Sequence, residues 1–176
     1  MRDVSKKYRS YGLAIKTEED GYNFYKKISD EAENKLIRET FKSFAADEMK
    51  HKEIIINFYN ALENNEAVEV PEKLGACSSI ELARTIFERA DEKVSESVKS
   101  DSDVIESYKM ASKLEDEGIK FYKQLHESTI SEKEKELYGA LMHMEEKHKE
   151  MLDNMIDYLN NPGDWFFEQE RWTIEG

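Results

Sequence analysis

One spacing of glutamate and histidine residues occurs twice in this chain of 176 residues. In each copy, a glutamate is followed thirty residues later by a Glu-x-x-His motif, and the second copy lies 97 positions after the first. The residues with this spacing are Glu18, Glu48, His51, Glu115, Glu145 and His148. Because residues three apart lie on the same face of a helix, the carboxylate and the imidazole of each motif can reach one metal ion. The chain therefore has two matched sets of candidate metal ligands.

The duplication extends beyond these ligand candidates. Other residues of the first half that recur unchanged 97 positions later are Ala14, Lys16, Gly21, Phe24, Tyr25, Lys26, Lys50, Lys52 and Glu53. The chain is therefore an internal duplication, and we expect two similar halves.

Apolar residues at alternating steps of three and four predict four long amphipathic helices. The first two should cover about residues 13–33 and 35–64. The runs Asp103 to Glu106 and Ser131 to Glu134 match the capping box that opens a helix, so they predict the starts of the third and fourth helices. Asn161 to Gly163 should end the fourth helix, because this run contains a proline followed by a glycine.

The segment 65–102 between the second and third helices is too long for a hairpin loop. Pro71 and Gly75 interrupt the helical pattern, and apolar residues at helical spacing resume from Ile80. We therefore expect a long helical crossover that runs along the bundle.

The spacing also predicts one site instead of two. Glu18 and Glu48 each lie about 15 residues from the turn that joins their helices, or roughly 22 Å at 1.5 Å per residue. Glu115 and Glu145 have the same relation to a turn near Ile130. Carboxylates inside a core cost several kcal/mol each unless they are paired or bound to metal, and two divalent ions would balance four of them. The alternative is a bundle whose glutamates and histidines face solvent.

This duplicated pattern resembles the ferritin-like di-iron carboxylate proteins and, among them, the rubrerythrin family. The resemblance covers about residues 12–160 apart from the middle segment. It implies an all-α, ferritin-like four-helix bundle over residues 1–160, with a long helical crossover between the second and third helices, and then an aromatic tail over residues 161–176. The implied roles are terminal ligands for Glu18 and Glu115, bridging ligands for Glu48 and Glu145, and one imidazole per metal for His51 and His148.

Two tyrosines and two glycines recur beside the ligand candidates. We expect the phenols of Tyr25 and Tyr122 to donate hydrogen bonds to ligand carboxylates, and we take them as candidate catalytic residues; the alternative is an ordinary core tyrosine. Gly21 and Gly118 either leave space for dioxygen or peroxide or allow close helix packing. Rubrerythrins typically have a further carboxylate at the position of Gly118, where this chain departs from the family, and the neighbouring Glu117 is expected to point away from the metals.

The composition argues against several classes of partner. A formal net charge of −13 repels nucleic acid and anionic membrane surfaces. No stretch approaches the roughly 18 apolar residues of a membrane span, and Met1 to Ser10 lacks the apolar run of a signal peptide, so we expect a cytoplasmic protein. Cys77 is the only cysteine, so neither a disulfide within the chain nor a rubredoxin-type iron centre is expected.

The resemblance implies a non-haem di-iron oxidoreductase that reduces hydrogen peroxide or dioxygen, as in protection against oxidative stress. Ligation by many oxygens and one imidazole per metal suits two iron ions, with manganese as the alternative. Because the chain lacks a thiolate iron centre, we expect an external electron donor, either a rubredoxin or a flavoprotein. The rival functions are a ferroxidase or iron-storage protein, in which iron is the substrate, and a structural protein with an incidental metal.

The tail is rich in large aromatic residues: Trp165, Phe166, Phe167 and Trp172. So many aromatic side chains in a free tail would form an exposed apolar patch. We therefore expect the tail to dock on the bundle or on a second subunit, and we expect a homodimer or a higher homo-oligomer.

Overall fold

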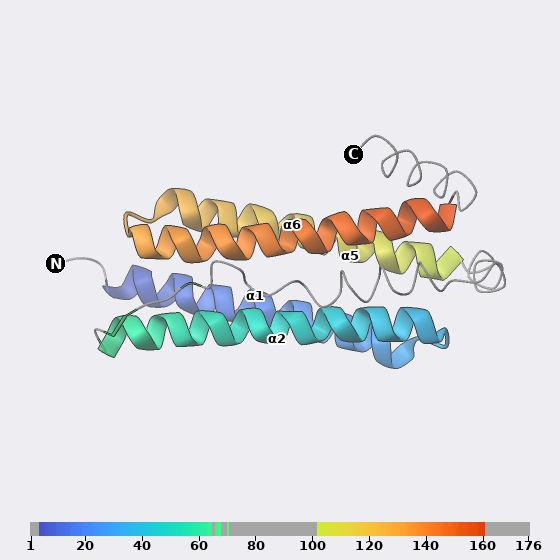
Figure 1. The fold of residues 1–176 in the computed structure, drawn as a ribbon, viewed down its shortest axis with the longest axis horizontal. Helices are drawn as coiled ribbons and strands as arrows, with labels where there is room; N and C mark the ends of the chain where they lie inside the picture. Colours follow the sequence, from blue (N-terminus) through green and yellow to red (C-terminus); the bar gives the residue numbers. More distant parts are fainter. Residues whose placement is uncertain (1–3, 65, 68–69, 71–101, 161–176) are drawn as a thin grey trace, which may run out of the picture.

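The computed structural model describes residues 4–64, 66–67, 70 and 102–160. Four long helices fill these ranges, and no strand occurs among the described residues. The helices are α1 (Val4–Glu31), α2 (Lys35–Asn64), α5 (Ser102–Ser128) and α6 (Glu132–Asn160). They lie side by side along one long axis (Figure 1), with α1 packed on α2 and α5 packed on α6. The predicted all-α, ferritin-like four-helix bundle is confirmed.

The connectivity of the helices agrees with a long crossover. Figure 1 shows that α2 ends at one end of the bundle and that α5 begins at the opposite end. An up-down-up-down bundle with short loops would instead begin its third helix near the end of its second. Most of the predicted crossover (residues 68–69 and 71–101) and the aromatic tail (residues 161–176) lie outside the described residues.

The predicted helix boundaries are closest for α2, whose observed bounds match the expected range 35–64. Helix α1 instead begins at Val4, earlier than the expected start near residue 13. The added turns are mostly polar and carry Val4, Tyr8 and Tyr11 at helical spacing, a short pattern that the prediction did not include. Tyr11 in this extension packs on Tyr59 of α2, with 4.7 Å between the ring centroids. The earlier start of α1 therefore comes with a contact to α2, at a residue far away in the sequence.

The capping box predicted for α6 is half formed. The Ser131 hydroxyl oxygen accepts a hydrogen bond from the backbone N–H of Glu134 at 3.4 Å, as expected for an N-cap. The second hydrogen bond of a capping box would run from the backbone N–H of Ser131 to the Glu134 carboxylate. That carboxylate instead accepts hydrogen bonds from the hydroxyls of Thr129 and Tyr59. At the start of α5, the side chain of Asp103 lies outside the described residues.

The buried apolar side chains form two clusters with the polar centre between them. Helix α2 shows this order along its length: Phe41 and Phe44 belong to one cluster, Glu48 follows, and Ile55 and Phe58 belong to the other. Apolar layers on both sides exclude water, and charges interact more strongly where water is excluded. Among the described helices, none has an apolar run sufficient to cross a membrane.

Candidate metal centre

The six residues with the duplicated spacing meet at the centre of the bundle. Each helix contributes one glutamate, and α2 and α6 add one histidine each. All six side chains are buried, and none is more than 4% exposed. The interpretation in which these residues face solvent is therefore wrong. Their role as metal ligands stays a prediction that this geometry supports.

The ligand atoms form two overlapping groups. One group comprises Glu18, Glu48, His51 and Glu145, and the other comprises Glu48, Glu115, Glu145 and His148. Within each group, the candidate ligand atoms all lie within 4.8 Å of one another. Glu48 and Glu145 belong to both groups. Two carboxylates shared by two ligand sets are what a centre of two bridged metal ions requires.

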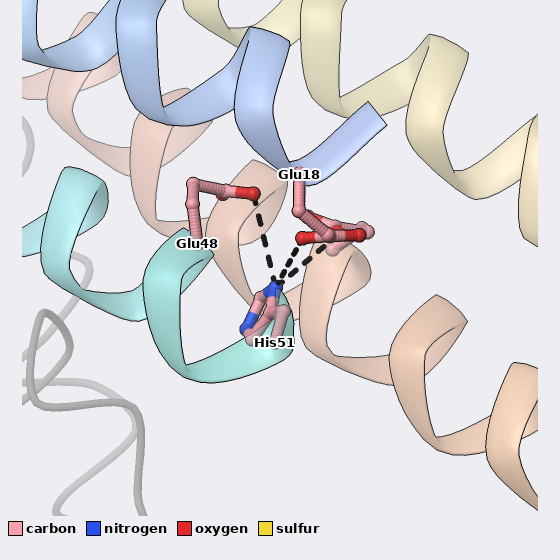
Figure 2. Close-up of side chains that lie close together, drawn as sticks. Glu18, Glu48 and His51 are labelled. Carbon is pink, nitrogen blue, oxygen red and sulfur yellow. Dashed lines mark hydrogen bonds and ion pairs between the residues drawn. The ribbon is translucent and has the colours of Figure 1, made fainter. Parts of the chain in front are cut away.

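Both histidines direct Nδ1 toward the carboxylates. Nδ1 of His51 lies 3.1 Å from Glu18 Oε2 and 3.5 Å from Glu145 Oε1. Figure 2 shows Glu18 and Glu48 directed at this same ring nitrogen. Nδ1 of His148 lies 3.5 Å from oxygens of three glutamates: Glu48, Glu115 and Glu145. Nδ1 is therefore the nitrogen that each imidazole would offer to a metal ion.

The electrostatics of the cluster favour cations. Burial, together with the negative charge of Glu145, raises the pKa of Glu18, Glu48 and Glu115 well above the ordinary glutamate value. Burial alone would also raise the pKa of Glu145, but hydrogen bonds from His148 and His51 outweigh it and lower that pKa. Without metal, these raised pKa values favour the protonated form of the three carboxyl groups, and divalent ions would displace such protons.

Unsatisfied buried atoms also fit a metal centre. Oε1 of Glu48 and Nε2 of His51 are buried and have no hydrogen-bond partner among the described residues. Buried polar atoms are nearly always hydrogen-bonded, and a role in binding an ion is a recognised reason for an exception. No lysine or arginine in the described ranges pairs with the four clustered glutamates. Oxygen-rich ligation with one imidazole per ion suits iron, so the residues present fit a di-iron site.

The two tyrosines link the halves of the duplication. The Tyr25 hydroxyl donates a hydrogen bond to Glu115 Oε1, and the Tyr122 hydroxyl donates one to Glu18 Oε1. Hydrogen bonds to ligand carboxylates were expected, but the crossing from one half to the other was not. Burial and the nearby charges of Glu115 and Glu48 raise the pKa of Tyr25, so this phenol keeps its proton and stays a donor.

A cavity of about 260 Å³ leads to the cluster between α1 and α5. Gly21 and Gly118 lie in its lining, and Tyr25, Glu48, Glu115 and Glu145 line it as well. Glu117, expected to point away from the metals, is exposed but also contributes to this lining. The space that the glycines were predicted to leave is therefore present.

The two glycines differ in what surrounds them. A methyl group at Gly21 would lie 2.9 Å from Glu48 Oε2, whereas one at Gly118 would lie 3.5 Å from Glu145 Cγ, an ordinary contact. We expect Gly21→Ala to displace the shared carboxylate of Glu48 and to weaken metal binding by about 10-fold or more. Gly118→Ala is the matched control and should bind metal as the native protein does. Equilibrium titration with Co²⁺ measures both, and equal affinities would contradict the assignment.

One buried acidic residue escaped the sequence analysis. Asp47 is 3% exposed, and its Oδ2 lies 3.7 Å from His148 Nε2. A comparison of the two halves does not select Asp47, because the corresponding residue of the second half is Met144. A search for acidic residues next to each Glu-x-x-His motif would have found Asp47.

Comparison with known proteins agrees with this geometry. The sequence model of the rubrerythrin family matches residues 12–156, a range that includes all six clustered residues and both tyrosines. No curated protein and no solved structure matches the chain. A match over most of the chain, together with the bundle and its buried Glu/His cluster, shows that the protein belongs to the rubrerythrin family of ferritin-like proteins.

Proposed function

We propose that this protein is a di-iron oxidoreductase that reduces hydrogen peroxide, with dioxygen as the alternative oxidant. The observation that carries the proposal is the pair of ligand groups that share Glu48 and Glu145 beside an open cavity. Glu18 and His51 would complete one metal position, and Glu115 and His148 the other. Two ferrous ions held there would supply the two electrons that reduction of peroxide to two waters consumes.

The cavity suits a small neutral oxidant. Its volume of about 260 Å³ exceeds what a molecule as small as hydrogen peroxide needs, and it reaches Glu48, Glu115 and Glu145. The exposed acidic residues Asp20 and Glu117 also line it, and the chain carries a net charge of −13. Negative charge at the approach disfavours anions such as superoxide relative to neutral peroxide.

Reduction of peroxide to water also consumes two protons. Tyr25 lines the cavity and holds a proton on the hydroxyl that donates to Glu115. Its raised pKa keeps that proton in place at neutral pH. We propose that Tyr25 orients Glu115 and keeps a donor at the cavity wall, while Tyr122 orients Glu18 from the other half.

The electrons would come from a separate protein, a rubredoxin or a flavoprotein. This part of the proposal rests on the relation to the rubrerythrin family; the 176 residues contain one cysteine, whereas a thiolate-bound iron centre needs several. The donor protein would then dock on the surface of the bundle, and mutagenesis of surface residues can identify its docking site.

The decisive experiment is anaerobic addition of hydrogen peroxide to the reduced, iron-loaded protein. We expect one peroxide to be consumed for every two irons, with two irons retained per chain through repeated reduction. His148→Ala is the control, because loss of this imidazole should empty one metal position and leave only background consumption. Uptake of many irons per chain would instead support the ferroxidase or storage function. Consumption equal to that of the control would contradict the peroxide chemistry.

A further inference from the structure

The internal duplication is broken at a residue that lies behind one of the histidines. Asp47 precedes the first Glu-x-x-His motif, whereas Met144 occupies the matching position of the second. The Asp47 carboxylate is buried, with Oδ2 3.7 Å from His148 Nε2 and Oδ1 2.7 Å from Lys50 Nζ. Glu48 of the first motif lies next to His148, and Glu145 of the second lies next to His51. If the two halves are arranged alike, Met144 therefore takes the place beside His51 that Asp47 takes beside His148.

This difference affects the imidazole nitrogen that faces away from the metals. An imidazole that binds a metal through Nδ1 carries its proton on Nε2, which then needs a hydrogen-bond acceptor. Asp47 lies on that side of His148, with Oδ2 3.7 Å from Nε2, an ion-pair distance that is longer than a hydrogen bond. All the carboxylate contacts of His51 in the described part of the chain are instead made by Nδ1, and its buried Nε2 has no carboxylate oxygen within 4.0 Å there. The thioether of Met144 would be only a weak acceptor.

The lysine beside each motif strengthens the contrast. Lys50 forms an ion pair with Asp47 at 2.7 Å, which holds the carboxylate next to His148. Its repeat, Lys147, instead pairs at 2.8 Å with Glu150, whose side chain is 61% exposed, whereas that of Asp47 is 4% exposed. The second half therefore lacks the buried acid and also the contact that orients it.

We propose that Asp47 is a positioning residue that makes the two metal positions unequal. The position that includes His148 and Glu115 binds a divalent ion more tightly than the position that includes His51 and Glu18. A carboxylate behind a ligand histidine fixes its tautomer and orientation and makes the imidazole a stronger ligand, an effect worth about 10–100-fold in metal affinity. The inference rests on the proposed two-metal centre. It adds an order of loading, in which the His148 position fills first and the His51 position exchanges more readily.

The test is anaerobic titration of the full-length, metal-free chain with Co²⁺, followed by optical absorption. The native protein should bind two ions with dissociation constants that differ by about 10–100-fold. Asp47→Met, which copies the second half into the first, should weaken the tighter step by that factor and bring the two steps together. Circular dichroism of each metal-free variant checks that the helices remain.

Two background variants assign the effect to one position. In His51→Ala, only the His148 position remains, and adding Asp47→Met should weaken Co²⁺ binding by about 10–100-fold. In His148→Ala, only the His51 position remains, and the same change should have little effect. Equal sensitivity in both backgrounds, or two equal steps in the native protein, would overturn the inference.

These outcomes are distinct from those of the peroxide experiment. Unequal binding that depends on Asp47, in a protein that does not reduce peroxide, would leave this inference in place and remove the proposed reaction. Peroxide reduction by a protein with two equal metal positions would do the reverse.

Discussion

Replacing Glu145 with alanine is expected to reduce the iron content of the protein from two ions to well below one per chain. Glu145 belongs to both ligand groups, so its loss removes one ligand from each metal position. Its oxygens also lie 3.5 Å from Nδ1 of both His51 and His148, so its loss removes a contact from each imidazole. Replacing Glu18 removes a ligand from one group only, and we expect Glu18→Ala to retain about one ion.

Elemental analysis after anaerobic loading with Fe²⁺ and gel filtration measures this difference. Glu150→Ala provides a control on the same helix, because Glu150 is exposed and pairs only with Lys147 among the described residues. It should retain two ions. Two ions in Glu145→Ala would show that this carboxylate is not shared, and unchanged loading of Glu18→Ala would remove Glu18 from the centre.

The metal-free protein is expected to become less stable as the pH rises from 5 to 8. Glu18, Glu48 and Glu115 have pKa values raised well above 4.5 in the folded state, mainly because they are buried. Between that ordinary value and the raised value, the folded chain binds more protons than the unfolded chain, so each group loses stability as the pH rises. The loss is about 1.4 kcal/mol per pH unit for each group within its window.

The other two groups of the cluster do not reverse this trend. Burial would lower the pKa of His51, but its hydrogen bond to Glu145 and the charges of Glu145 and Glu48 raise it, so His51 also contributes less stability as the pH rises. The lowered pKa of Glu145 matters only below the ordinary glutamate value of 4.5, because its stabilisation is lost as the pH falls.

Thermal unfolding followed by circular dichroism at pH 5, 6, 7 and 8 tests this expectation. A loss of 1 kcal/mol lowers the melting temperature by about 2–4 °C in a chain of this size. The variant Glu115→Gln keeps the side-chain volume and removes one titrating group, so its melting temperature should fall less steeply. The iron-loaded protein should show no such fall, because the ions neutralise the carboxylates. A metal-free protein that gains stability with rising pH would contradict the raised pKa values of these glutamates.

The sequence allowed the helices and the ligand candidates to be predicted because both follow from local rules. Apolar spacing identified the four helices, and it located α2 closely because Phe41, Phe44, Ile55 and Phe58 mark one face over the whole helix. It missed the first turns of α1, which are mostly polar and have only Val4, Tyr8 and Tyr11 at helical spacing. The Ser131 cap was predicted, but the side chain of Glu134 found partners that depend on the packing of α2.

The amino-acid sequence by itself determined the all-α fold, the duplication and the six residues that meet at its centre. These features depend on the spacing of residues within single helices and on their equal distances from two turns. Both can be counted along the sequence. Only the tertiary structure decided that Tyr25 contacts Glu115, that Gly21 is crowded while Gly118 is not, and that Asp47 lies behind His148. Each of these depends on how one helix pair is rotated and shifted against the other, to within an ångström or two. No periodicity within a single helix specifies that relation.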